Sequence, residues 1–184
     1  MDADAGGSNQ DGGVGPATHD PLTGLPTRLH LQARLRRAGS DLGESRWLAV
    51  ICLSCDRFPT GDTARGRAAR DVCLVELADR LRAEIRGADT AARLGGDAFA
   101  VLLADLADVT DAVGIGERLR RTLERPVRWS RGEITLSVRG GVATVGAGDP
   151  DPQAALGRAE AALGRARPGG PSRFVVAGPA GSPG

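Results

Sequence analysis

The chain has few aromatic side chains and no tyrosine, since phenylalanine and tryptophan together make up 3% of its 184 residues. This composition disfavours an aromatic platform on which single-stranded nucleic acid could stack. Basic and acidic residues are nearly balanced, at 24 and 23, so the formal charge is +1 and there is no net basic field for nucleic acid or an anionic membrane. We therefore expect any recognition of anions to be local.

Long apolar runs are also lacking. No stretch approaches the roughly 20 residues that span a bilayer, and the first ten residues, MDADAGGSNQ, have neither the basic start nor the hydrophobic stretch of a secretory signal. The cysteines, Cys52, Cys55 and Cys73, are an odd number, which favours free thiols over a disulfide framework. These features predict a cytoplasmic protein that binds neither membrane nor nucleic acid.

The length fits one domain with a single hydrophobic core. Residues 1–18 are almost entirely small or polar, and residues 178–184 are similar. Such segments bury too little apolar surface to offset the entropy cost of ordering. We expect one domain over residues 19–177 between two disordered tails.

Hydrophobic periodicity predicts helices that alternate with strands. Helical spacing recurs at 31–38, after an N-cap at Thr27, and at 74–85, 112–123 and 155–166. Strand patterns occur at 47–53, 90–94, 98–103, 134–138, 142–145 and 174–177. The strands that flank Gly95-Gly96 predict a hairpin whose turn needs positive φ at both glycines. A hairpin within an alternating pattern favours the α/β (α+β) class, with a mixed sheet of about five strands flanked by helices.

Five motifs carry a family resemblance: HDPLTGLPTR from His19, CDRF from Cys55, RGAD from Arg86, RLGGDAF from Arg93 and AEAALGRAR from Ala159. In order and spacing they resemble the GGDEF, or diguanylate cyclase, domain over residues 20–177. The resemblance implies a nucleotidyl-cyclase-like palm with the Gly-Gly hairpin at the active site. It also implies that two such domains meet to join two GTP molecules into cyclic di-GMP.

The resemblance places the catalytic metal between two carboxylates, one at the end of the first strand and one at the third position of the hairpin motif. Such metal ions neutralise the charge that develops during phosphoryl transfer. Here Ser54 stands at the first position, and a neutral hydroxyl is a poor ligand for a hard cation. Asp97 keeps the second position, Ala98 replaces the glutamate that follows, and Asp56 remains a candidate metal ligand. We expect Mg²⁺ only if the chain is catalytic or binds GTP.

The same resemblance gives an incomplete GTP site. Gly95 and Gly96 let backbone amides approach a phosphate, and Asp71 matches one of two guanine-contacting positions. The asparagine of the other position is missing from the shortened segment 60–63, and Pro59 stands where the family has a lysine. Near the C-terminus, Arg167 corresponds to a phosphate-binding lysine of the family. Gly164 replaces an aromatic residue there, and Pro171 replaces a further basic residue.

A second candidate site is the segment Arg86-Gly87-Ala88-Asp89, nine positions before Gly95. The resemblance identifies it with an inhibitory Arg-x-x-Asp site for cyclic di-GMP. An arginine fork can pair with guanine O6 and N7 or with a phosphate, and an aspartate can accept from guanine N1 and N2. Arg118 is expected to add a phosphate contact from a neighbouring molecule. The alternative is an ordinary i, i+3 ion pair at the end of a helix.

The sequence thus leads to one function and two alternatives. The leading hypothesis is a catalytically degenerate GGDEF domain that binds cyclic di-GMP through Arg86 and Asp89, with a homodimer on ligand binding and an unidentified protein partner. The first alternative is a weak or heterodimeric diguanylate cyclase that uses Asp97 and Asp56, although no sensory or coiled-coil segment is expected to bring two sites together. The second is a GTP-binding or structural interaction module.

Overall fold

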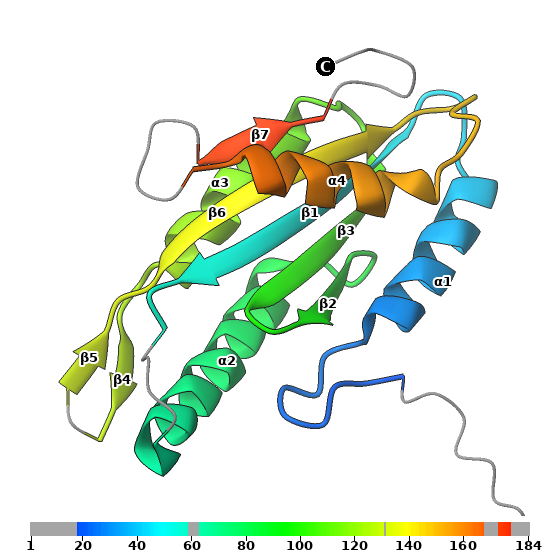
Figure 1. Ribbon diagram of the computed structural model, residues 1–184. Helices are drawn as coiled ribbons and strands as arrows, with labels where there is room; N and C mark the ends of the chain where they lie inside the picture. Colours follow the sequence, from blue (N-terminus) through cyan, green and yellow to red (C-terminus); the bar gives the residue numbers. More distant parts are fainter. Residues whose placement is uncertain (1–17, 59–62, 131, 168–172, 178–184) are drawn as a thin grey trace, which may run out of the picture.

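The computed structural model describes residues 18–58, 63–130, 132–167 and 173–177 (Figure 1). The predicted tails, apart from Thr18, lie outside these ranges, as do Pro59 and Pro171. Along the chain the elements are α1 (Arg28–Ser40), β1 (Trp47–Asp56), α2 (Ala64–Glu84), β2 (Thr90–Gly95), β3 (Ala98–Leu106), α3 (Asp111–Leu123), β4 (Val127–Trp129), β5 (Gly132–Ile134), β6 (Ser137–Val145), α4 (Ala154–Arg165) and β7 (Phe174–Val176). No helix in the described part of the chain has the length and apolar content that would let it cross a bilayer.

The main sheet has five strands in the order β2-β3-β1-β6-β7. Neighbouring strands are antiparallel except β6 and β7, which are parallel. The sequence-based prediction of a mixed, five-stranded sheet with helices is confirmed. The apolar run at 47–53 forms most of β1, which lies in the middle of the sheet because its side chains can be buried on both faces.

Two layers of helices cover the sheet, with α1 and α4 on the face toward the viewer in Figure 1 and α2 and α3 behind. Alternate residues of β1 therefore enter two different cores: Ile51 and Leu53 pack on the side of α2 and α3, whereas Val50 and Cys52 pack on the side of α1 and α4. Cys55 belongs to the first core, so the thiols of Cys52 and Cys55 lie on opposite faces. All three cysteines are free and buried, as the sequence predicts.

Three elements differ from the sequence-based boundaries. Helix α2 begins ten residues before the predicted 74, at Ala64, and the Thr63 hydroxyl caps it by accepting from the Gly66 amide at 3.1 Å. Of the two strands predicted at 134–138 and 142–145, residues 137–145 form one continuous strand, β6, whereas Ile134 ends β5. Gly141 in β6 allows α4 to lie directly on this strand. A Cβ atom at Gly141 would come within 2.2 Å of the Ala159 carbonyl oxygen. The small β4-β5 hairpin was not predicted, since each of its strands has only three residues.

Candidate functional site

The β2-β3 hairpin presents the first candidate site. Gly95 pairs with Ala98 across the hairpin, so the two loop residues are Gly96 and Asp97 rather than the predicted Gly95 and Gly96. Both glycines nevertheless have the expected positive φ, 113° and 56°, because a register shift between Arg93 and Gly95 forms a bulge beside the loop. The Arg93 guanidinium donates to the Gly96 carbonyl at 2.9 Å and so fixes the loop.

Three strands bring a row of side chains to the end of the sheet beside this loop. In the antiparallel register Ser54 of β1 lies opposite Ala98 of β3 on one side and opposite Arg139 of β6 on the other. Directly opposed residues share one face of the sheet. The row therefore offers a hydroxyl, a methyl group and a guanidinium, and no carboxylate.

Asp97 already has a cationic partner. Arg70 of α2 forms an ion pair with its carboxylate, and the same guanidinium lies over the ring of Phe58, 5.2 Å from its centroid. The Asp97 main chain is tied to β1, since its carbonyl accepts from the Cys55 amide at 3.2 Å. Asp97 thus lies in the hairpin loop beside β1, and its carboxylate is paired with Arg70.

Asp56 is engaged in the same way. Its carboxylate accepts from Arg139 Nε at 3.1 Å, and Arg139 also donates to the Leu163 carbonyl of α4 at 3.4 Å. In the described ranges no three His, Cys, Asp or Glu side chains come close enough to hold a metal ion. With a serine in the middle of the row and both acids paired with arginine, the side chains present do not fit a divalent metal ion.

The remaining predicted GTP contacts, Asp71 and Arg167, lie on the exposed surface. Asp71 is exposed on α2, and Arg167 is exposed just after the end of α4. Gly164 has open space around it, with no heavy atom within 4 Å of the place that a Cβ atom would take. These three residues leave the predicted guanine and phosphate contacts on the surface.

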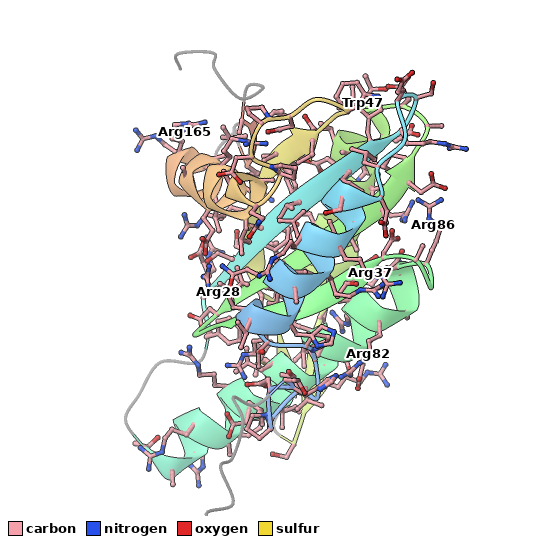
Figure 2. The ribbon with its side chains drawn as sticks, turned by 90° about the vertical axis from the view of Figure 1, so that its right-hand side faces the viewer. Arg28, Arg37, Trp47, Arg82, Arg86 and Arg165 are labelled. Carbon is pink, nitrogen blue, oxygen red and sulfur yellow. The ribbon has the colours of Figure 1, made fainter. Side chains whose placement is uncertain are left out.

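The second candidate site is the turn between α2 and β2. Asp89 is almost buried, with 3% of its side chain exposed, and its carboxylate accepts from the amides of Arg86 and Ala104, both at 3.1 Å. The Arg86 guanidinium lies 3.6 Å from Asp89 and is 64% exposed. Figure 2 shows Arg86 at the edge of the molecule, just beyond the end of α2. Asp89 therefore shapes the turn, and Arg86 extends from it.

A pocket of about 660 Å³ opens beside this turn. Arg86, Asp89 and Arg118 all line it, so the structure brings the three predicted residues together. Arg118 comes from α3 of the same chain, where its Nε lies 3.2 Å from a Glu84 carboxylate oxygen. Arg118 thus lines this pocket within one molecule, and its expected phosphate contact from a neighbouring molecule stays a prediction.

Sequence reasoning missed a third arginine in this pocket. Arg46 precedes β1 and also lines the pocket, with its Nε 3.2 Å from the Asp105 carboxylate. Asp105 has a positive φ of 56°, which is uncommon outside glycine. No motif marks Arg46, because the pairing of β1 with β3 is what carries it to the turn.

Comparisons with known proteins agree with this fold. Residues 17–173 match the family model described as diguanylate cyclase, GGDEF domain. Diguanylate cyclase TpbB of Pseudomonas aeruginosa is 41% identical over 149 residues, which are 80% of this chain and 34% of that protein. The chain thus spans about a third of the length of this curated relative.

Two solved structures are similar over most of their length. One is the GGDEF domain of TpbB, also called YfiN, from Pseudomonas aeruginosa. It superposes on this chain with a TM-score of 0.74 at 37% identity, and the match covers 87% of this chain and 94% of the TpbB domain. The coiled coil and GGDEF domain of DgcB from Caulobacter crescentus, solved in complex with c-di-GMP, has a TM-score of 0.73 at 27% identity, with 87% of this chain and 85% of that one covered.

Proposed function

Since this chain belongs to the diguanylate cyclase GGDEF domain family, we propose that it is a signalling domain that binds cyclic di-GMP in the Arg86 pocket and has lost cyclase activity. The observation that carries the proposal is a contrast between two sites. The pocket beside Arg86 is open and lined by arginines, whereas the acids of the hairpin site are bound to arginines of the chain itself.

The guanidinium groups in the pocket wall suit the phosphates and guanines of the ligand, and they lie among four acids, Glu84, Asp89, Asp105 and Asp111. Arg46, Arg86 and Arg118 each lie beside one acid, Asp105, Asp89 and Glu84, at 3.2–3.6 Å. All three arginines are about half exposed or more, so their pairs are solvated and exchange partners at little cost. An arginine fork can then bind a phosphate or the O6–N7 edge of a guanine in two parallel hydrogen bonds.

Asp89 has two roles in this proposal. Its two backbone bonds hold Arg86 at the mouth of the pocket, which makes it a positioning residue. A carboxylate has about four acceptor sites, so Asp89 keeps capacity to accept from guanine N1 and N2. The i, i+3 ion pair that the sequence allowed as an alternative does form, at 3.6 Å, and it is compatible with ligand binding.

The argument for loss of catalysis comes from the row of Ser54, Ala98 and Arg139 beside the hairpin. Phosphoryl transfer to or from GTP requires charge neutralisation by correctly placed cations. Ser54 and Ala98 supply no negative charge to hold a metal ion, and Asp97 is paired with Arg70. No step of a cyclase reaction is therefore assigned to this chain.

Calorimetric titration of the whole chain with cyclic di-GMP tests the proposal. We expect micromolar or tighter binding that weakens roughly 10- to 100-fold in Arg86→Ala, because a hydrogen bond between charged groups is worth about 1.5–3 kcal/mol. Arg121→Ala is the matched control, since Arg121 is exposed on α3 but does not line the pocket. Unchanged affinity in Arg86→Ala, or no binding by the native chain, would contradict the site.

Experiments with GTP distinguish the two alternative functions. Asp97 lies in the hairpin loop, where the family resemblance predicts a metal ligand, and TpbB is named a diguanylate cyclase; both favour a weak or heterodimeric cyclase as the second candidate. Chromatography after incubation with GTP and Mg²⁺ or Mn²⁺ detects product, and formation of cyclic di-GMP that Asp97→Ala abolishes would establish that candidate. Preference for GTP over cyclic di-GMP, without product, would instead indicate a GTP-binding module.

A further inference from the structure

We propose that Arg70 occupies the place of a divalent metal ion at the hairpin, as a built-in cation that neutralises Asp97 and closes this end of the sheet to divalent metals. The inference concerns the hairpin alone. It does not depend on the binding of cyclic di-GMP in the Arg86 pocket, which lies beyond the other end of β2.

The position of Arg70 is defined by three elements. It comes from the second turn of α2, its guanidinium lies over the ring of Phe58 just after β1, and it pairs with Asp97 in the hairpin loop. A guanidinium over an aromatic face is attracted by the ring quadrupole. Phe58 is itself buried, with 6% of its surface exposed, so it offers a fixed platform. Arg70 is thereby held against Asp97 from two sides.

A second arginine closes the other side of the site. Arg139 lies opposite Ser54 in the register of β1 and β6, and its Nε is bound to Asp56 at 3.1 Å. Mg²⁺ takes oxygen ligands in near-octahedral geometry and is held in proteins by carboxylates. An entering metal would find a hydroxyl at Ser54, while the guanidinium groups of Arg70 and Arg139 repel it and compete for the carboxylates of Asp97 and Asp56.

The chemistry of arginine makes this replacement permanent. The chain contains no lysine, so all 24 of its Lys and Arg residues are arginine. A guanidinium stays charged at every pH at which a protein is folded. The charge of Asp97 is therefore balanced inside the chain, and the conformation of the hairpin does not respond to the concentration of divalent ions.

Binding of Mn²⁺, measured on the whole chain by electron paramagnetic resonance, tests the inference without any need for catalysis. The native chain should show no site with a dissociation constant below millimolar. The double variant Ser54→Asp with Ala98→Glu restores the missing acids but should bind Mn²⁺ weakly. Adding Arg70→Ala to the double variant should tighten binding at least tenfold and broaden the amide NMR signals of Gly95 and Gly96.

Two further variants separate a specific effect from general electrostatics. Arg65→Ala in the double variant removes an exposed arginine from the same end of α2 and should leave Mn²⁺ binding unchanged. Arg70→Gln keeps the first three carbons of the side chain and a hydrogen-bond donor while removing the charge, so it should behave like Arg70→Ala and guards against a packing defect. Far-UV circular dichroism verifies the fold of each variant. Equal Mn²⁺ affinity with and without Arg70, or tight binding by the native chain, would overturn the inference.

Discussion

Asp89 and Asp97 lie just outside the two ends of strand β2, Asp89 immediately before Thr90 and Asp97 in the loop that follows Gly95. At about 3.3 Å per residue, six residues of strand hold the two acids roughly 20 Å apart. Each acid is paired with an arginine, Arg86 at one end and Arg70 at the other. The Arg86 end opens into a pocket of about 660 Å³. Because of the distance between the two ends, substitutions at them are expected to act independently.

Replacement of Asp89 by alanine should lower the free energy of unfolding by about 2 kcal/mol, because the backbone amides of Arg86 and Ala104 lose the nearly buried carboxylate that accepts their hydrogen bonds. Arg86→Ala is the matched control. Its side chain is exposed and its amide remains, so stability should change by no more than about 0.5 kcal/mol. Urea denaturation followed by circular dichroism measures both. Equal stability of the two variants would show that the turn does not depend on the Asp89 carboxylate.

Arg46→Ala should weaken cyclic di-GMP binding by roughly fivefold, which corresponds to about 1 kcal/mol for a partly solvated charged contact. The reason is its position in the wall of the pocket, opposite the turn that carries Arg86. Arg36→Ala, an exposed arginine of α1 that is not part of the pocket wall, is the control. Titration calorimetry compares the variants, and an affinity equal to that of the native chain would remove Arg46 from the ligand site.

Gly141→Ala should destabilise the chain by about 2–4 kcal/mol, since the added Cβ would collide with the backbone of α4 at Ala159 and Leu163. Gly157→Ala serves as the contrast. It lies in α4 with no heavy atom near its Cβ position, and alanine is the better helix former by about 0.5–1 kcal/mol. Thermal unfolding should therefore shift downward in the first variant and slightly upward in the second. A shift of the same sign in both would contradict the packing of α4 on β6.

The thiols should be inert in the folded chain. Burial raises the pKa of Cys52 to about 12 and also raises the pKa values of Cys55 and Cys73, so the reactive thiolate is suppressed. A disulfide reagent at pH 8 should react slowly with the native chain and with all three cysteines after unfolding in guanidinium chloride. Rapid reaction of any thiol in the native chain would show that its surroundings open readily.

The raised pKa values of the cysteines also make the free energy of unfolding depend on pH. The cysteines hold their protons more tightly in the folded state than in the unfolded state, whose pKa is near 9. Above pH 9 the unfolded chain loses protons that the folded chain retains, so the free energy of unfolding falls as pH rises toward 12. Denaturation at pH 8, 9 and 10 should show the decline, and Cys52→Ala should reduce its slope.

Several elements could be predicted from the sequence because their signals are local. The apolar run at 47–53 identified the central strand, and Gly95 and Gly96 identified the hairpin through their need for positive φ. The spacing of Arg86 and Asp89 placed both in one turn. The loop itself was predicted one residue too early, because the bulge beside Gly95 shifts the register and leaves no mark in the sequence.

The partners of the acids could not be predicted. Arg70 and Asp97 are 27 residues apart, and Arg139 and Asp56 are 83 apart. Their contacts depend on how α2 crosses the sheet and on the register between β1 and β6, which are products of tertiary packing rather than of local periodicity. Arg46 was missed for the same reason, since only the pairing of β1 with β3 brings it near Asp105.

The row of Ala98, Ser54 and Arg139 across three strands has an evolutionary consequence. A mutation that restores one acid at Ser54 or Ala98 places it among arginines and, without the others, gives no metal site for selection to favour. A metal site in this row would therefore require several changes at once, on β1, β3 and α2.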